Sequence, residues 1–250
     1  MPSSNVNSPT KLSRQRAGFT LIELLTVIAI IGILAAIIIP TVGRVRESAR
    51  SSKCVTGLRQ INLALKIYVE DNKGFLPTAE RKPAAGETGT RYVTWHHLLA
   101  PYLPNRSNLT SGTVHEIFTC PSANFNGKTG TELASTYTAT AALLGLQGQE
   151  ATLRGKARKL TSIDSNRQTQ IPLIMEGKPV SANAREALHS QNWNQASTDI
   201  SVESPESTQY FNFLHNDRMN VNYVDGSVRS MDFATFKALD KATYTGVPAN

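Results

Sequence analysis

The sequence predicts an α+β fold, in which a long N-terminal helix packs on a small antiparallel β-sheet domain. Residues 19–39 form an almost uninterrupted apolar run, and apolar residues then recur every three or four positions, which predicts a helix with a membrane half and an amphipathic half. Near the C-terminus, apolar and polar residues alternate before an Asp-Gly pair, which predicts a β-hairpin. At 250 residues, the chain has room for this helix and one domain with a buried core.

The apolar run is long enough to cross a membrane. It has 21 residues, of which one, Glu23, is ionisable. At about 1.5 Å per residue its helix would be roughly 31 Å long, close to the bilayer hydrocarbon core of about 30 Å. A carboxylate in such a helix is costly without a partner, so Glu23 is a functional candidate. A secretory signal peptide is the alternative, but its cleavage site would follow the apolar core, where Ala35-Ala36-Ile37 fits poorly.

Residues 1–18 have the composition of a cleaved leader, with three basic side chains and no acidic one. Gly18 would let a protease approach the backbone closely. Cleavage after Gly18 would create an amine on Phe19, at the helix end where the helix dipole adds positive charge. Glu23 would neutralise this amine either in its own chain or in an identical neighbour, and only the second arrangement builds a polymer.

These N-terminal residues resemble a known family. The stretch Arg16–Leu25 (RAGFTLIELL), with Pro40 at position 22 of the trimmed chain, is similar to the N-terminal signature of type IV pilins and type II secretion pseudopilins. The resemblance implies that a prepilin peptidase cuts between Gly18 and Phe19 and methylates the new amine. It also implies that Glu23 sets the register during assembly and that Pro40 marks a break in the helix.

The same resemblance implies a pilin-like organisation of the whole chain. We expect a cleaved leader at 1–18, a membrane helix at 19–39, an amphipathic continuation at 40–74 and a globular extracytoplasmic domain at 75–250. Basic residues lie on both sides of the membrane run, so charge does not set the orientation. The resemblance implies one pass through the inner membrane, with the leader in the cytoplasm and the C-terminal domain in the periplasm or outside. The implied partners are identical and related subunits, the prepilin peptidase, an inner-membrane assembly platform and membrane lipid.

Composition argues against several other classes. The formal net charge is +7, but without residues 1–18 the chain has 23 basic and 19 acidic side chains. No Lys/Arg run interleaved with aromatic residues follows the membrane segment, so we expect no nucleic-acid binding. The sequence has no recognisable nucleophile, base and acid combination and no metal-spaced cluster, so we expect no enzyme and no resident cofactor.

The sequence therefore favours a structural subunit of a type IV pilus-like filament. We favour a type II secretion pseudopilin that supports protein export, because the chain lacks the C-terminal disulfide loop common in adhesive pilins. A type IV pilin for adhesion, motility or DNA uptake is one alternative. A membrane-anchored binding domain with a pilin-type anchor is another.

Beyond the membrane run, the pattern predicts further elements. The amphipathic stripe consists of Cys54, Leu58, Ile61, Leu65 and Tyr68. The helix should extend from Thr20 to Asn72, because Gly74 favours a left-handed cap. A short helix is expected in Tyr92–Tyr102, where His96 and His97 point about 100° apart and so would not share a metal ion. A short strand or edge segment closed by proline is expected at Ile117–Pro121, and a buried strand is expected at Ile171–Met175. The stretch 181–208 reads as a long loop, either an interaction surface or a simple insertion.

The C-terminal pattern predicts the hairpin. Met219, Val221 and Tyr223 alternate with asparagines, as in a strand. Asp225-Gly226 should form a turn in which both residues have positive φ, and Ser227–Phe233 should form the returning strand. His215 precedes Asp225 by ten residues, which resembles the His-x9-Asp-Gly motif of pilin-like proteins from environmental bacteria. The segments CVTGLRQI at Cys54 and FTCPS at Cys120 resemble the same family.

Two questions stay open from the sequence. Cys54 and Cys120 lie outside the membrane, in a compartment where disulfides persist, so they form either a disulfide or two buried thiols. Asp217, Asn220 and Asp225 offer oxygen atoms for calcium, which pseudopilins commonly hold near the C-terminus, although histidine is a poor calcium ligand. The structural alternative is that the turn explains Asp225 and Gly226. His215 would then bond the preceding segment to the hairpin, with its ring against apolar neighbours.

Overall fold

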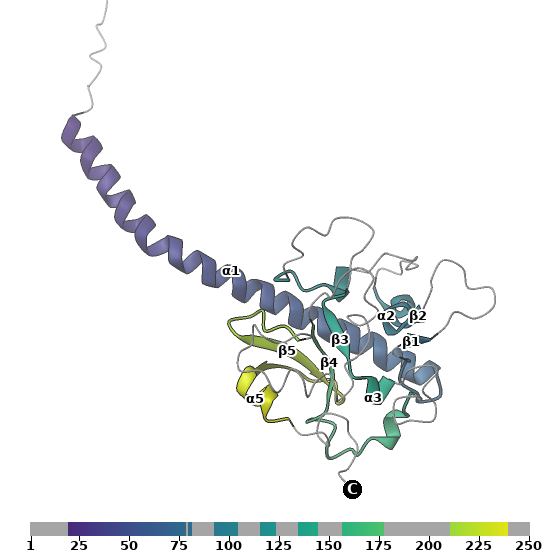
Figure 1. Ribbon diagram of the computed structural model, residues 1–250. Helices are drawn as coiled ribbons and strands as arrows, with labels where there is room; N and C mark the ends of the chain where they lie inside the picture. Colours follow the sequence, from purple (N-terminus) through teal and green to yellow (C-terminus); the bar gives the residue numbers. More distant parts are fainter. Residues whose placement is uncertain are drawn as a thin grey trace, which may run out of the picture. The chain divides into compact units, whose positions relative to one another are not determined.

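The computed structural model describes residues 20–78, 80–81, 93–104, 116–123, 135–144, 157–177 and 211–239. The chain forms two compact units, Met1–Val45 and Arg46–Asn250. The second unit combines part of a long helix with a four-stranded antiparallel sheet, which confirms the predicted α+β fold (Figure 1). The leader 1–18, Phe19 and the loop expected at 181–208 lie outside the described residues.

Helix α1 extends over Leu21–Asp71, close to the expected Thr20–Asn72. Its first half exposes apolar side chains, and among the described residues α1 is the one helix that is long and apolar enough to cross a membrane. Pro40 lies inside α1, so the expected break at this residue is wrong. A proline removes one backbone N–H from the helix. Here the Thr41 hydroxyl donates to the carbonyl of Ile38 at 2.7 Å, which adds a local hydrogen bond to this turn.

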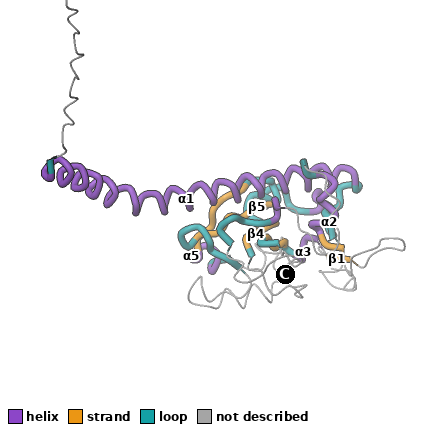
Figure 2. Tube along the Cα trace, turned by 90° about the horizontal axis from the view of Figure 1, so that it is seen from above, coloured by secondary structure: helices purple, strands orange, loops and turns teal. Residues whose placement is uncertain are grey.

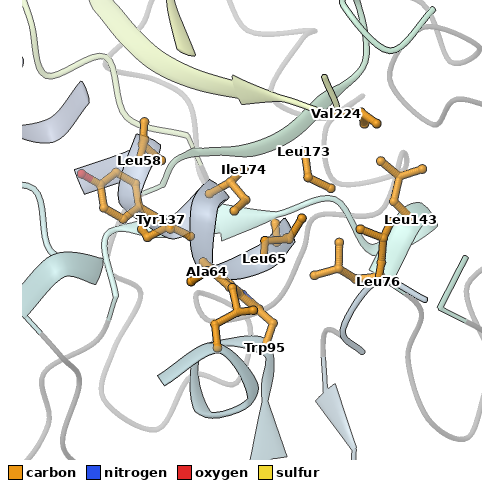
Figure 3. Close-up of a cluster of buried hydrophobic side chains, with 14 of the residues drawn as sticks. Leu58, Ala64, Leu65, Leu76, Trp95, Tyr137, Leu143, Leu173, Ile174 and Val224 are labelled. Atoms are coloured by element: carbon orange, nitrogen blue, oxygen red, sulfur yellow. The ribbon is translucent and has the colours of Figure 1, made fainter. Parts of the chain in front are cut away.

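The second half of α1 presents an apolar stripe to the core of the Arg46–Asn250 unit. Its buried apolar members are Cys54, Leu58, Ile61, Ala64, Leu65 and Val69. Figure 3 shows Leu58, Ala64 and Leu65 in one cluster with Trp95, Tyr137, Leu173 and Ile174. The helix ends where Lys73 and Gly74 adopt positive φ angles of 56° and 83°. The Gly74 N–H donates to the Val69 carbonyl at 2.8 Å, which is the bond that closes a Schellman cap.

The sheet has the strand order β3-β4-β5-β6, and every neighbouring pair is antiparallel. The strands are β3 (Tyr137–Ala139), β4 (Pro172–Glu176), β5 (Arg218–Tyr223) and β6 (Val228–Asp232). Strand β4 confirms the buried strand expected at Ile171–Met175. A second, two-stranded sheet pairs β1 (Glu80–Arg81) with β2 (Val93–Thr94). Figures 1 and 2 show β4 and β5 lying beside the second half of α1.

Strand β5 is buried on both faces. Its apolar side chains pack in a second core cluster, whose buried members are Met175, Phe211, Phe213, Met219, Val221, Tyr223, Met231 and Phe236. The intervening asparagines face α1. Asn62 Nδ2 donates to Asn222 Oδ1 at 3.2 Å, and Asn220 Nδ2 donates to Ser51 Oγ at 3.5 Å. The alternation in the sequence therefore separates an apolar face from a polar face, and both lie inside the domain.

Short helices connect these strands. They are α2 (Trp95–Leu99), η1 (Ala100–Tyr102), η2 (Glu116–Phe118), α3 (Ala141–Leu144), η3 (Leu160–Ser162) and α5 (Phe233–Lys237). Elements α2 and η1 confirm the short helix expected in Tyr92–Tyr102. The short strand expected at Ile117–Pro121 is wrong, because Glu116–Phe118 forms the 3-10 helix η2. The Thr119 N–H donates to the Glu116 carbonyl and the Ala123 N–H to the Cys120 carbonyl, both at 3.0 Å, so the segment forms two consecutive turns. Its Phe118 carbonyl still accepts one backbone hydrogen bond, from the Thr136 N–H at 3.0 Å.

The β5–β6 hairpin is confirmed, but its turn has three residues rather than two. The Gly226 N–H donates to the Tyr223 carbonyl and the Tyr223 N–H to the Ser227 carbonyl, both at 2.9 Å. Gly226 has a φ of 94°, whereas Asp225 is not among the described residues with positive φ. Three-residue hairpin turns need the left-handed conformation only at their last position. The expectation of positive φ at both residues is therefore wrong for Asp225.

Candidate functional site

The first candidate region is the start of α1. Glu23 Oε2 accepts hydrogen bonds from the Thr20 backbone N–H at 2.9 Å and from the Thr20 hydroxyl at 2.7 Å. The Glu23 N–H donates back to Thr20 Oγ1 at 3.3 Å, so the two residues form a capping box. Gly18 and Phe19, between which the cleavage is expected, lie outside the described residues. In the uncut chain, the Glu23 carboxylate thus bonds Thr20 at the start of its own helix.

The second candidate region is a buried polar cluster around His215. The ring lies between two carboxylates: Nδ1 is 2.8 Å from Glu47 Oε1 and Nε2 is 3.0 Å from Glu176 Oε1. Glu47 comes from α1, Glu176 ends β4, and His215 precedes β5. The ring of His215 therefore contacts carboxylates, and the expectation of apolar neighbours is wrong in this respect. An ionised carboxylate only accepts hydrogen bonds, so a carboxylate beside each ring nitrogen favours the doubly protonated imidazolium form of His215.

A tight turn presents the imidazole to the carboxylates. The His215 N–H donates to the Arg218 carbonyl at 3.0 Å, which closes the turn in front of β5. Asn216 and Asp217 have φ angles of 53° and 58°. Asparagine and aspartate tolerate this left-handed conformation better than most other residues, because their short side chains bond locally. The local sequence His-Asn-Asp therefore fits the turn that buries the ring.

Glu176 is completely buried and well bonded. Its Oε2 accepts the Asn220 backbone N–H at 2.8 Å, and its Oε1 accepts Asn220 Nδ2 at 3.1 Å in addition to His215 Nε2. These donors and the imidazolium compensate a charge that would otherwise be costly to bury. Burial and the nearby charge of Glu176 raise the pKa of the Tyr137 hydroxyl well above its ordinary value.

Glu47 closes the cluster on its more exposed side. Its Oε1 accepts the Ser122 hydroxyl at 2.8 Å, and Arg50 lies 3.7 Å from its Oε2. Partial burial acts to raise the pKa of Glu47, but the hydrogen bonds of Ser122 and His215 and the nearby positive charges lower it overall. Burial likewise acts to lower the pKa of His215, but Glu176 and Glu47 outweigh it and raise that pKa. Both shifts favour the charged pair.

The two cysteines complete the cluster. Cys54 on α1 and Cys120 form a disulfide, with their Cα atoms 5.3 Å apart. The Cys120 sulfur lies 3.4 Å from His215 Nε2. The bond joins α1 to the segment that carries Ser122, so the disulfide and the Glu47 hydrogen bonds hold the same elements together.

The calcium candidates lie elsewhere. Asp225 Oδ1 accepts the Ser227 N–H at 2.9 Å and the Ser227 hydroxyl at 2.8 Å, which is the pattern of an Asx turn. Asp217 is exposed in the left-handed turn before β5. The Asn220 amide bonds Glu176. Each of the three proposed oxygen donors thus has a structural explanation of its own.

Sequence reasoning missed Glu47 and Glu176. The Glu176 carboxylate gave a usable signal, because it directly follows the apolar run Ile171–Met175 and an acid at the end of a buried strand needs a partner. Glu47 lies in a charged stretch of α1 where no local pattern distinguishes it from its neighbours.

Comparison with known proteins identifies the N-terminal region. Residues 13–39 match the family described as "Prokaryotic N-terminal methylation motif". The chain therefore carries a prepilin-type N-terminus, and together with the apolar half of α1 this indicates a membrane-anchored, pilin-like chain. The family match ends before Glu47 and does not extend to the His215 cluster.

The similar curated proteins are pilins and pseudopilins. The chain is 36% identical over 83 residues to the type IV major pilin protein PilA of Myxococcus xanthus, and the matched segment covers 33% of this chain and 38% of the pilin. It is 38% identical over 68 residues to the type II secretion system core protein G of Aeromonas hydrophila, covering 27% of this chain and 47% of that protein. The same protein of Klebsiella pneumoniae is 40% identical over 70 residues, covering 28% and 49%. The chain thus spans less than half the length of these relatives, and no solved structure matches it.

Proposed function

We propose that this chain is a structural subunit of a type IV pilus-like filament, and that it serves as a type II secretion pseudopilin in protein export. The observation that carries this proposal is the exposed apolar first half of α1, whose first turn carries the carboxylate of Glu23. Such a surface suits lipid before assembly and the helices of neighbouring copies afterwards. The similarity to core protein G supports the pseudopilin role, and we assign the chain a structural rather than a catalytic function.

The proposed assembly starts with a prepilin peptidase that cuts after Gly18 and methylates the amine of Phe19. Removal of the leader puts a positive charge at the end of α1. Glu23 of one copy then pairs with the Phe19 amine of the next, in an environment where an unpaired charge is costly. The anchored subunit would reside in the inner membrane with its globular unit in the periplasm or outside, beside an assembly platform that adds subunits.

Replacing Glu23 by glutamine tests this proposal. Glu23→Gln should insert into membranes as well as the wild type, because an uncharged amide is less costly in lipid. Filament yield after shearing should fall strongly, since breaking one side of a buried ion pair costs about 3 to 5 kcal/mol. Glu70→Gln is the matched control, because Glu70 is an exposed glutamate on the C-terminal half of the same helix. Equal filament yield from wild type and Glu23→Gln would contradict the proposal.

A type IV pilin is the second candidate, and the similarity to the pilin PilA favours it. The two candidates differ in what a deletion strain loses. Loss of secreted protein from the medium with surface filaments unchanged supports the pseudopilin, whereas loss of surface filaments, motility or DNA uptake supports the pilin. A membrane-anchored binding domain would give neither loss, and its subunits would stay monomeric in detergent.

A further inference from the structure

The buried cluster brings together four atoms that bind metal ions. They are the sulfurs of Cys54 and Cys120, a carboxylate oxygen of Glu176 and a ring nitrogen of His215, and all lie within 4.8 Å of one another. All four side chains are buried. Two thiolates, one imidazole and one carboxylate form a donor set that suits zinc, and zinc sites that hold their ion with four protein ligands are tetrahedral.

The separations already approach those of a tetrahedral site. With zinc bonds of about 2.0 to 2.3 Å, neighbouring ligand atoms lie about 3.2 to 3.8 Å apart. His215 Nε2 is 3.4 Å from the Cys120 sulfur and 3.0 Å from Glu176 Oε1. The bond between Cys54 and Cys120 is the main obstacle, because two sulfurs joined to each other cannot both bind one metal ion as thiolates.

The groups behind the four ligands provide an independent indication. Zinc-binding histidines usually donate their second ring N–H to a carboxylate or carbonyl, which fixes the tautomer. Here Glu47 lies 2.8 Å from His215 Nδ1 and is itself held by the Ser122 hydroxyl. This arrangement keeps Nδ1 protonated and points Nε2 at the cluster. Asn220 holds the second oxygen of Glu176 in the same way, through its backbone N–H.

We infer that the Cys54–Cys120 pair, His215 and Glu176 form a zinc site when the disulfide is reduced, and that metal and disulfide exclude each other. In the reduced chain, Zn²⁺ would bind two thiolates, Nε2 and a Glu176 oxygen, while three protons, two from the thiols and one from Nε2, pass to the solvent. Oxidation reverses the step. A disulfide reagent accepts two electrons and becomes two thiolates, the bond between Cys54 and Cys120 forms, and the zinc is released.

Metal binding by the purified full chain in detergent tests this inference. A phosphine reductant opens the disulfide with uptake of water and becomes a phosphine oxide, so no competing thiol remains. Titration with Co²⁺ should then give one equivalent of binding, with the visible bands of a tetrahedral ion and a thiolate-to-cobalt charge-transfer band. Zn²⁺ should displace the cobalt and protect both cysteines from alkylation. The oxidised chain should give none of these signals.

Variants separate the four-ligand site from a cysteine pair alone. His215→Asn and Glu176→Gln should each weaken zinc binding, and Glu47→Gln should weaken it about 10- to 100-fold through the orientation of His215. His97→Asn is the matched control, since His97 is a half-buried histidine of the same unit outside the cluster and should leave binding unchanged.

Several outcomes would overturn the inference. They are the absence of stoichiometric binding to the reduced chain, octahedral cobalt spectra, or equal zinc affinity in the wild type and His215→Asn. If reduction unfolds the globular unit, zinc must restore its circular dichroism spectrum and raise its Tm. Failure to do so counts equally against a site, because a site built by the fold must stabilise that fold.

Discussion

Replacing His215 by alanine should strongly destabilise the oxidised, chelator-treated protein. The ring lies 2.8 Å from Glu47 and 3.0 Å from Glu176, and Glu176 is 0% exposed. Without the imidazolium, the Asn220 donors are the remaining described partners of a buried charge. Removal of one partner from a buried ion pair typically costs about 3 to 5 kcal/mol, and we expect a loss of this size in the free energy of unfolding.

This loss translates into a measurable shift of the melting temperature. For a unit of the size of Arg46–Asn250, each kcal/mol shifts Tm by about 2 to 4 °C, so the expected decrease is about 6 to 20 °C. Circular dichroism on the full chain in detergent measures Tm, and denaturant titration measures the free energy directly. The decrease should be the same with calcium or with a chelator present. A calcium-dependent stabilisation of the wild type that Asp225→Ala or Asp217→Ala abolishes would instead support a calcium site.

A second substitution tests the cause of the loss. If His215→Ala destabilises because it leaves a buried charge, then adding Glu176→Gln should recover part of the stability, since a neutral amide is less costly to bury. The two substitutions would then be strongly non-additive. A loss below about 1 kcal/mol for His215→Ala, or strict additivity with Glu176→Gln, would refute the role of an ion pair.

The same charges predict how stability depends on pH. The pKa of His215 is raised above 6.5, so its contribution is complete below this value and is lost as the pH rises through the folded-state pKa. The pKa of Glu47 is lowered below 4.5, so its contribution is present above this value and is lost as the pH falls through the folded-state pKa. Stability should therefore be greatest between these limits, and His215→Ala should remove the loss at higher pH. A Tm profile of His215→Ala parallel to that of the wild type would exclude this explanation.

Three further predictions concern the turn, the disulfide and the leader. Gly226→Ala should lower the free energy of unfolding more than Gly74→Ala does. Both glycines have positive φ, but of the two only Gly226 has neighbours close to an added Cβ, Asn62 Oδ1 at 2.7 Å and Lys66 Nζ at 2.8 Å. Equal losses in denaturant titrations would contradict this prediction. Reduction of the disulfide with metal chelated should lower the free energy of unfolding by about 4 kcal/mol for a separation of 66 residues, and unchanged denaturant midpoints would contradict this. The mature chain should begin at Phe19, and Gly18→Val should retain the leader; N-terminal mass analysis that finds an intact wild-type leader in membranes would disprove this cleavage.

The elements that the sequence predicted are those whose signal is local. Helix α1 repeats an apolar position every three or four residues, and strand β4 is a short apolar run, so each is visible within a small window. The segment at Ile117–Cys120 has the apolar and β-branched composition of a strand. Here two consecutive turns with Pro121 decide the backbone, and Cys120 is bonded to α1.

The polar cluster was not predictable in the same way. His215 lies 168 residues from Glu47 and 39 residues from Glu176 in the chain, so no window contains the set. The motif spacing drew attention to His215 but not to its partners. The alternation in β5 predicted two faces, yet it did not show that the asparagine face lies against α1 rather than in solvent. In both cases the missing information is the packing of the sheet on the helix.

The packing of β5 on α1 accounts for the spacing of His215 and Gly226, the two ends of the His-x9-Asp-Gly motif in this chain. The contacts of β5 and its flanks advance along α1 in chain order, from Glu47 through Ser51 to Asn62, where the turn residue Gly226 meets the helix. The helix rises about 22 Å from Glu47 to Asn62, and the six residues of β5 span about 20 Å. His215 therefore attaches the start of β5 to α1, and Gly226 allows the end of β5 to approach α1. The number of residues between His215 and Gly226 thus matches the length of α1 that β5 covers. Insertion of one residue between them would turn the asparagine face away from the helix, because neighbouring side chains of a strand point to opposite faces.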